Sequence, residues 1–244
     1  MSVSRTKPDW KRVIIKLSGE ALTGDHSFGL HAPTVARIAR DIAGAASLGI
    51  EIGVVVGGGN FFRGLQGGTE TGIERARADS IGMLATVMNA LALEAALEAE
   101  KAPARALSAI AMPALCQPYS RQAALHHLAK GRIVVLAGGT GNPFFTTDTG
   151  AALRAAELSA NAVMKATNVD GVYTADPKRD PKATRYTDLT HDEAIARELA
   201  VMDTAAFALA RENRIPIIVF SIREEGAIRA ALEGKGHATY VWPS

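Results

Sequence analysis

The chain has 244 residues, of which 48% are hydrophobic and 21% charged, and its formal net charge is +2. These values are typical of a globular protein that can bury a sizeable core, and so small a net charge gives no support for a nucleic-acid partner. Cys116 is the one cysteine, residues 1–10 hold no secretory signal, and no uncharged apolar run reaches the roughly 18 residues that span a bilayer, so we exclude an intramolecular disulfide and expect a cytoplasmic protein without a membrane partner.

Short β-branched runs alternate with helical patterns along the chain. In chain order, the pattern predicts a strand at 13–15, a helix at 33–48, a strand at 50–56, a helix at 79–100, a strand at 104–108, a helix at 120–129, a strand at 132–136, a helix at 149–159, a strand at 161–166, helices at 191–199 and 203–211, a strand at 215–220, a helix at 224–232 and a strand at 239–242.

Several predicted strands are apolar on both faces, as in Val54-Val55-Val56 and in residues 133–136. Strands of this kind are typical of a parallel sheet that helices cover on both sides. The fold class is therefore predicted to be α/β, a three-layer αβα sandwich with a central, mainly parallel sheet. No change in composition marks a linker, so we expect one domain at 11–244 after a flexible terminus at 1–10.

Four predicted strands end in loops rich in glycine, lysine or hydroxyl residues, at 16–20, 57–64, 138–148 and 165–171. Ligands of open parallel sheets bind beyond the carboxyl ends of the strands. Glycines there allow backbone N–H groups to approach a phosphate. A single loop of this kind is more often a tight turn, but several at one sheet edge favour a phosphate-binding site.

Two common nucleotide-binding signatures are missing from the sequence. The Gly234-Lys235 step is followed by Gly236 and does not form a P-loop, and Gly139-x-Gly141 has Phe144 where a dinucleotide fingerprint needs a third small residue. Phosphates must therefore be held in another way.

Six motifs in order resemble those of bacterial uridylate (UMP) kinases, of the amino-acid-kinase superfamily, over residues 11–241. They are KLSGEAL at 16–22, VVVGGGNFFRG at 54–64, GMLATVMNALAL at 82–93, GTGNPFFTTD at 139–148, KATNVDGVYTADP at 165–177 and VMDTAAFALA at 201–210. The resemblance implies transfer of the γ-phosphoryl group of ATP to UMP, giving ADP and UDP, in pyrimidine nucleotide biosynthesis. It also implies Mg²⁺ bound through the nucleotide phosphates, a homohexamer, activation by GTP and inhibition by UTP.

The resemblance also assigns ligands residue by residue. The ATP side consists of Lys16, Leu17, Ser18, Gly19, Gly59, Arg63, Thr167, Asn168, Tyr173 and Asp176. The UMP side consists of Gly58, Asp79, Thr140, Gly141, Asn142, Pro143, Phe144, Phe145, Thr146 and Thr147. The loop linked to GTP activation consists of Gly24, Asp25, His26, Ser27, Phe28 and Gly29.

Phosphoryl transfer requires mainly positioning and positive charge around the transferred group. Lys16, Arg63 and Mg²⁺ are expected to supply that charge, with Lys165 as a second lysine. Asp148 is expected to orient the lysines or a magnesium-bound water, and Asp203 to support the site from behind. The phosphate of UMP already carries a nucleophilic oxygen, so no strong general base is needed.

Structural roles compete with several of these assignments. Asp79 and Asp148 both precede predicted helices, so each is also a candidate N-cap. Tyr173 is equally suited to packing, and Phe144 and Phe145 to anchoring their loop. Two other functions stay open: a kinase that forms an acylphosphate from acetylglutamate or carbamate, and a nucleotide-binding store for molybdenum oxoanions.

Overall fold

The computed structural model describes residues 9–62, 72–175, 177, 179–199 and 201–244. Within them, nine strands form one sheet in the order β4-β3-β5-β2-β1-β6-β8-β9-β7. The strands are β1 (Arg12–Leu17), β2 (Glu51–Val56), β3 (Ala104–Ser108), β4 (Gln117–Pro118), β5 (Ile133–Ala137), β6 (Ala162–Thr167), β7 (Asp188–Thr190), β8 (Ile217–Ser221) and β9 (Ala238–Trp242). Neighbouring strands are parallel, apart from the antiparallel pair β8 and β9.

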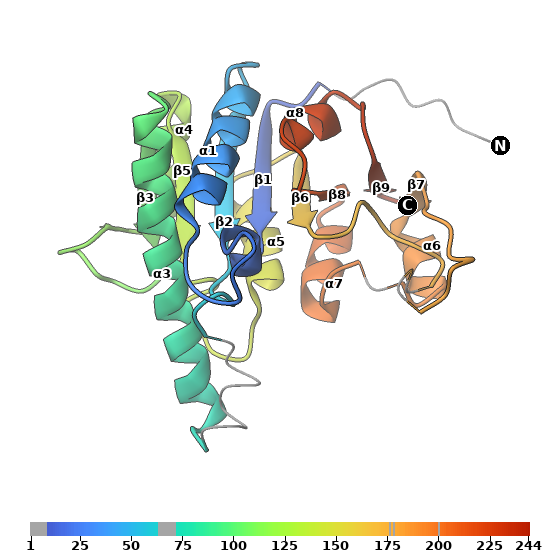
Figure 1. Ribbon diagram of the computed structural model, residues 1–244, viewed down its shortest axis with the longest axis horizontal. Coiled ribbons are helices and arrows are strands. Elements are labelled where there is room, and N and C mark those ends of the chain that lie inside the picture. Colours follow the sequence, from blue (N-terminus) through green and yellow to red (C-terminus); the bar gives the residue numbers. More distant parts are fainter. Residues whose placement is uncertain (1–8, 63–71, 176, 178, 200) are drawn as a thin grey trace.

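Helices lie on both faces of this sheet (Figure 1). The helices are α1 (Ala32–Ala46), α3 (Arg75–Ala99), α4 (Arg121–Ala129), α5 (Thr147–Glu157), α6 (His191–Ala196), α7 (Thr204–Glu212) and α8 (Ala227–Leu232), with a short 3₁₀ helix, η1, at Gly19–Leu22. Helices α1, α3 and α8 share one core with the sheet, and α4, α5 and α7 share a second core on the other face. The predicted αβα sandwich with a mainly parallel sheet is confirmed.

The alternation of side chains along β1 explains why its residues are apolar on both faces. Val13, Ile15 and Leu17 are fully buried in the core beneath α1, whereas Ile14 is fully buried in the core beneath α5. Because successive side chains of a strand point to opposite faces, Lys16 falls on the same face as Ile14. A lysine is thereby directed toward α5 at the end of an otherwise apolar strand.

Some helix boundaries differ from the predicted ones for local reasons. Helix α3 begins at Arg75, one turn before Asp79, and the two side chains form an ion pair at 2.8 Å. Helix α8 begins at Ala227 because Gly226 has a left-handed backbone with φ of 78°. Helix α6 ends at Ala196, two residues before Glu198, whose φ is 52°. The short strands β4 and β7 were not predicted, since neither has an apolar run of its own.

Helix α3 is the one helix of the described residues whose length and composition would suffice to cross a membrane, and 39% of its most apolar 18-residue stretch is buried in the protein. Leu93 and Leu97 are fully buried in the core shared with the sheet. A long core helix meets the same criteria as a membrane span, and the packing of α3 accounts for part of its apolar character.

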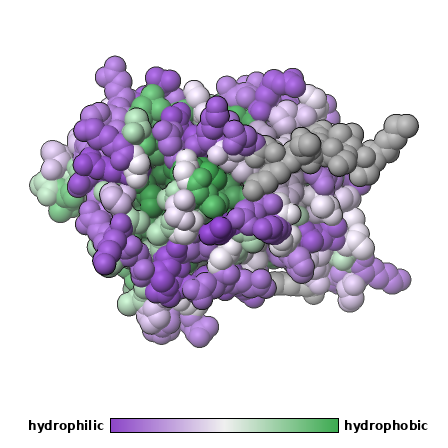
Figure 2. Space-filling view, turned by 90° about the horizontal axis from the view of Figure 1, so that it is seen from above, coloured by the Kyte–Doolittle hydropathy of each residue, from purple (hydrophilic) through white to green (hydrophobic). Residues whose placement is uncertain are grey.

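Aromatic side chains join the start of the described chain to its last strand. Trp10 is 6% exposed, donates its indole N–H to the carbonyl of Leu232 at 3.1 Å, and stacks on Trp242 with 6.5 Å between ring centroids. Trp242 in turn stacks on Tyr240 at 5.7 Å. The stack lies toward the end at which the parallel strands begin, because Trp10 precedes β1 and Trp242 ends β9, which is antiparallel to β8. Seen from that end, the surface is mostly hydrophilic with smaller hydrophobic patches (Figure 2).

Candidate active site

Two lysines stand side by side at the carboxyl ends of the central strands. Lys16 on β1 and Lys165 on β6 are register partners, and both lie on the face covered by α5. The carboxylate of Asp148, in the first turn of α5, lies between them: Lys16 Nζ is 2.8 Å from Oδ1 and Lys165 Nζ is 2.8 Å from Oδ2. Lys165 also donates to the carbonyl of Val201 at 2.9 Å. The two ammonium groups are thus fixed by one shared carboxylate.

The electrostatics of this cluster favour the charged form of Asp148. Burial alone would raise the pKa of the carboxyl group, which is 8% exposed, but the charges of Lys16 and Lys165 outweigh burial and hold the pKa below its usual value. The cluster carries a net positive charge from two cations and one anion. Such a site attracts phosphate groups.

The alternative that Asp148 caps α5 is wrong. Helix α5 begins at Thr147, and its N-cap is Thr146, whose hydroxyl accepts hydrogen bonds from the N–H groups of Asp148 and Thr149 at 3.0 and 3.4 Å. The side chain of Asp148 is therefore free to turn toward the lysines. Asp203, the N-cap of α7, accepts hydrogen bonds from the hydroxyls of Thr146 and Thr149 and so ties this helix start to α7.

The loops after β1 and β2 are in close contact beside Lys16. Gly57 donates its N–H to the carbonyl of Leu17 at 2.8 Å. A Cβ atom on Gly19 would lie 2.6 Å from Asn60 Oδ1 and 2.7 Å from the nitrogen of Gly59, so only glycine allows this approach. The structure thus brings Ser18, Gly19 and Gly59 together next to Lys16, while the side chain of Leu17 is buried in the core.

The loop that the resemblance assigns to UMP runs from the end of β5 to the start of α5. Its glycines adopt left-handed conformations, with φ of 55° at Gly139 and 83° at Gly141. Phe144, with φ of 70°, donates its N–H to Asp79 Oδ2 at 2.8 Å. Asp79 therefore binds this loop and Arg75 instead of capping α3, so the capping alternative is wrong here as well.

The aromatic residues of this loop do not anchor it in the core. Phe144 and Phe145 are 65% and 52% exposed, and the guanidinium of Arg75 lies 5.8 Å from the centre of the Phe144 ring. Gly58, also assigned to UMP, packs against α3, where a Cβ atom would lie 2.6 Å from the carbonyl oxygen of Gly82. The remaining loop residues are half-buried or exposed: Thr140, Asn142, Pro143 and Thr147.

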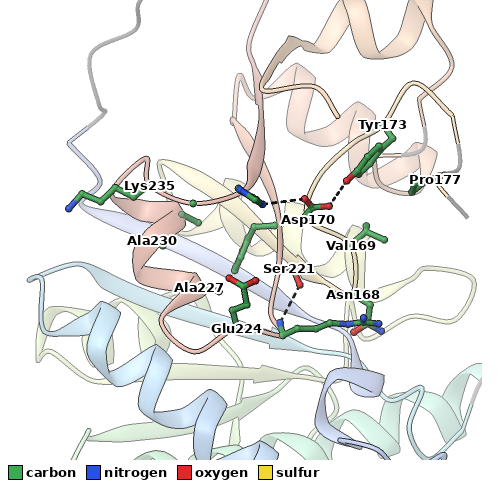
Figure 3. Close-up of a pocket in the computed structure, with 15 residues that line it drawn as sticks. Asn168, Val169, Asp170, Tyr173, Pro177, Ser221, Glu224, Ala227, Ala230 and Lys235 are labelled. Carbon is green, nitrogen blue, oxygen red and sulfur yellow. Dashed lines mark hydrogen bonds and ion pairs between the residues drawn. The ribbon is translucent and has the colours of Figure 1, made fainter. Parts of the chain in front are cut away.

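A separate cavity of about 340 Å³ opens beyond β6 and β8 (Figure 3). Asn168 and Tyr173, two residues assigned to the adenosine side, line it, whereas Thr167 ends β6 and accepts a backbone hydrogen bond from Ile222. The Tyr173 hydroxyl donates to Asp170 Oδ1 at 2.7 Å, which fixes the ring at the cavity wall and raises the pKa of the tyrosine.

Sequence reasoning missed the other side of this cavity. Its wall includes residues of the β8–α8 loop and of the segment before β9: Ser221, Arg223, Glu224, Lys235, Gly236 and His237. The carboxyl end of β8 was a usable signal, because it reaches the same sheet edge as the four glycine-rich loops. The segment before β9 offered no such signal, since only the fold brings it to Asp170, where His237 Nδ1 lies 3.7 Å from Oδ2.

The loop assigned to GTP activation touches the glycine loop after β2. Gly29 donates its N–H to the carbonyl of Asn60, and the Asn60 side chain donates back to the carbonyl of Gly29, both at 2.9 Å. Phe28 packs edge-on against Phe61 with 5.5 Å between ring centres. Gly24 and Asp25 line a groove of about 580 Å³ that also includes Asn168 and Arg223. His26 and Ser27 are exposed.

Arg63 and Asp176, both assigned to the ATP side, lie outside the described residues.

Comparison with known proteins identifies the family of the chain. Residues 11–221 match the amino acid kinase family. The chain is 64% identical over 234 residues to the uridylate kinase of Azorhizobium caulinodans, covering 96% of this chain and 98% of that protein. It is 58% identical over 236 residues to the uridylate kinase of Agrobacterium fabrum, with 97% and 98% covered.

Solved structures give the same result. The UMP kinase of Bacillus anthracis superposes with a TM-score of 0.91 at 39% identity, covering 96% of each chain. The UMP kinase of Ureaplasma parvum also gives 0.91, at 36% identity, covering 96% of this chain and all of that one. The chain therefore belongs to the amino acid kinase family, in the branch formed by the uridylate kinases.

Proposed function

We propose that this protein transfers the γ-phosphoryl group of ATP to UMP, giving ADP and UDP, and so serves pyrimidine nucleotide biosynthesis in the cytoplasm. The observation that carries the proposal is the Lys16–Asp148–Lys165 cluster at the junction of the glycine loops. Relatives that share 58% and 64% of their aligned residues with this chain are named uridylate kinases. We take residues 11–244 as the catalytic unit.

Positive charge and positioning account for the chemistry of the transfer. An oxygen of the UMP phosphate attacks the γ-phosphorus, and the bond from that phosphorus to the β–γ bridging oxygen breaks, leaving the electron pair on ADP. Lys16 and Lys165, held by Asp148, stabilise the charge that develops on the transferred group and the leaving oxygen. Arg63, which follows the glycine loop in sequence, is proposed to add a planar guanidinium between the two nucleotides.

ATP is proposed to lie along the edge of the sheet from the glycine loops to the cavity beyond β6. Its phosphates meet the backbone of Ser18, Gly19 and Gly59 beside Lys16, where the two glycine loops approach each other closely. Its adenosine enters the cavity of about 340 Å³ next to Asn168 and Tyr173. Thr167 and Asp176 complete the proposed ATP side.

UMP is proposed to bind in the loop between β5 and α5. Asp79 on α3 already binds the backbone of Phe144, which keeps this loop close to α3, and Gly58 packs against the same helix at Gly82. The loop ends at Thr146 and Thr147, and Asp148 follows directly, so a phosphate bound there lies next to the lysine cluster.

The residues of the site fit a magnesium ion that is held by nucleotide phosphates. Both oxygens of Asp148 are engaged by lysines, and the described residues contain no group of three or more histidine, cysteine or carboxylate side chains that could hold a metal. Mg²⁺ commonly keeps several waters and binds through substrate phosphates with one or two carboxylates. When bound, the ion would neutralise phosphate charge, and Asp148 is the carboxylate best placed to meet one of its waters.

Regulation is proposed to act through the contact between two loops. Gly29, the last residue of the 24–29 loop, forms reciprocal hydrogen bonds with Asn60, which directly follows the glycines proposed to meet ATP. A GTP that binds beside residues 24–29 would thereby influence the phosphate loop. UTP, a pyrimidine nucleotide like UMP, is proposed to inhibit by occupying the UMP side.

Self-association is proposed from an exposed apolar surface on α3 and its neighbours. A groove of about 430 Å³ is lined by Phe28, Phe61, Phe62, Ile81, Leu84, Ala85, Val87, Met88, Leu91, Met112 and Leu115. Leu84, Met88 and Leu115 are 44%, 47% and 58% exposed. A contiguous apolar surface of this kind is typical of an interface, and the proposed assembly is a homohexamer.

A coupled ADP-release assay tests the proposed function. With ATP and Mg²⁺, we expect turnover of UMP and little of CMP, dUMP, AMP, acetylglutamate or carbamate, and an increase when GTP is added. Purified protein that binds ATP but leaves UMP unchanged would contradict the proposal and favour a storage or sensor protein. Turnover of acetylglutamate or carbamate alone would indicate an acylphosphate-forming kinase.

Replacement of Arg63 by alanine is expected to lower kcat on the order of a thousandfold, the size of effect that a transition-state arginine gives in phosphoryl transfer. Circular dichroism should show an unchanged fold. The Arg63→Lys variant keeps the charge without the planar fork and should be intermediate. Unchanged kinetics in the alanine variant would remove Arg63 from the proposed site.

Asp148→Asn is expected to lower activity by about a hundredfold, because the two lysines lose the charge that orients them. The lowered pKa of Asp148 also predicts a pH effect on stability. The ionised carboxylate stabilises the folded protein above its unfolded pKa of 3.8, and this contribution is lost as the pH falls through the lower folded pKa.

Urea unfolding between neutral and acid pH measures this effect. The free energy of unfolding should fall less steeply in acid for Asp148→Asn than for the unchanged protein. Glu212→Gln, on an exposed position of α7, serves as the control and should keep the original slope. Equal slopes in all three proteins would show that Asp148 does not lose a stabilising charge.

Met88→Glu is expected to dissociate the assembly, because a charge would have to be buried in the apolar interface. Light scattering after size-exclusion chromatography measures the mass of the particle. Ala129→Glu, exposed at the end of α4 on the other face of the sheet, should leave that mass unchanged. A Met88→Glu protein of unchanged mass would show that this surface is not the interface.

A further inference from the structure

A buried arginine on α5 binds the loop between β5 and α5 from the interior of the protein. Arg154 is 4% exposed, and its Nη2 donates to the carbonyl of Gly139 at 3.1 Å. Its Nη1 donates to Glu157 Oε2 at 2.6 Å, and the guanidinium lies 3.8 Å from the centre of the Tyr119 ring. The proposed transfer gives this residue no role, although burying a charge is costly unless it is well paired.

The partners of Arg154 are themselves held in place. Tyr119 donates its hydroxyl to the same Glu157 oxygen at 2.5 Å, and burial, together with this hydrogen bond, raises the pKa of the tyrosine, so that it stays a donor. The N–H of Tyr119 donates to the carbonyl of Ser108 at the end of β3. The guanidinium is therefore fixed by an aromatic ring on one side and a carboxylate on another.

The contact with Gly139 sets the direction of the next peptide group. In a trans peptide the carbonyl and the following N–H point to opposite sides. Because the carbonyl of Gly139 points to Arg154 inside the protein, the N–H of Thr140 points away from α5, and it donates to no acceptor among the residues that the structure describes. An outward, unpaired N–H at this position suits an oxygen of a bound ligand.

The contacts of the neighbouring residues do not orient the carbonyl of Gly139, so its direction depends on Arg154. Gly138 is tied to Thr86 by a hydrogen bond of 2.7 Å, and Gly141 donates back to the carbonyl of Gly138 at 2.8 Å. Gly150 lets α5 approach Gly139 closely, since a Cβ atom there would lie 3.2 Å from its backbone. The left-handed backbone of Gly139 has a φ of 55°. Of the contacts described for Gly139, the bond from Arg154 is the one that orients its carbonyl.

We propose that Arg154 is a positioning residue for the acceptor nucleotide: it holds the carbonyl of Gly139 so that the N–H of Thr140 faces UMP. The inference rests on the proposed function, because UMP is the ligand proposed for this loop. Arg154 itself does not touch the nucleotide. Lysine cannot replace it fully, since a point charge lacks the planar fork that binds Gly139 and Glu157 at once.

Steady-state kinetics with each nucleotide varied in turn tests the proposal. Arg154→Met should raise the KM for UMP about tenfold, the size expected when a charge-assisted hydrogen bond is lost, while the KM for ATP stays within about twofold. Arg154→Lys should restore part of the affinity for UMP. Tyr119→Phe, which keeps the ring but removes the bond to Glu157, should shift the KM for UMP in the same direction by less.

Arg121 provides the matched control. Arg121, at the start of α4, donates its Nε to the carbonyl of the same Glu157 at 2.6 Å, but it has no contact with Gly139 among those described. Arg121→Met should leave both KM values unchanged. Equal increases in the two KM values of Arg154→Met, or the same increase in Arg121→Met, would show a general structural role and overturn the proposal.

Hydrogen exchange gives a readout that does not depend on activity. Peptides that cover 138–146 should exchange faster in Arg154→Lys and Arg154→Met, while peptides that cover α1 stay unchanged. Unchanged exchange at 138–146 overturns the proposal for Arg154. If the protein without substitutions fails to turn over UMP, the proposed function is overturned. If residues 138–146 nevertheless exchange faster in the Arg154 variants, the positioning of the loop by Arg154 is still supported.

Discussion

One carboxylate between two ammonium groups is the interaction on which the site depends. Lys16 and Lys165 are register partners on adjacent parallel strands, so their side chains would repel each other if Asp148 were absent. The arrangement requires three separate elements to meet: two strand ends and the first turn of α5. Burial opposes the charge on Asp148, and the two lysines more than compensate, so the carboxylate depends on both lysines for its charged form.

Contacts between backbone segments shape the surroundings of this cluster. The loops after β1 and β2 approach until a methyl group no longer fits between Gly19 and Gly59. Thr146 caps the first turn of α5, so the carboxylate of Asp148 has no capping role and can bind the lysines. Asp203 then ties that cap to α7. These contacts set glycine loops, whose backbone N–H groups can meet a phosphate, beside the two ammonium groups.

The order of strands and helices was predictable from the sequence because short β-branched runs, apolar on both faces, alternate with longer helical patterns. The convergence of the glycine loops was predictable as well, since parallel strands share one carboxyl edge. Local ambiguity was harder to resolve. Asp79 and Asp148 both resemble N-caps, and only the positions of Glu74 and Thr146 in the folded helices decide otherwise.

Contacts between segments that are distant in the chain could not be predicted from the sequence. Arg154 lies in α5, whereas Tyr119 lies in the loop before α4, and nothing in either segment predicts that the guanidinium stacks on the ring. The wall that Lys235 and His237 add to the cavity beyond β6 depends on where β9 joins the sheet, antiparallel to β8. The assignments of individual residues to ATP, UMP and GTP came from resemblance and stay proposals.

The aromatic stack at the opposite edge of the sheet gives the protein an internal optical reporter. The chain has two tryptophans, Trp10 and Trp242, and both belong to this stack. Trp10 precedes β1, whereas Lys16 lies near its other end, so a strand separates the indoles from the lysine cluster. Tryptophan emission will therefore report on the docking of the last strand against the start of the described chain.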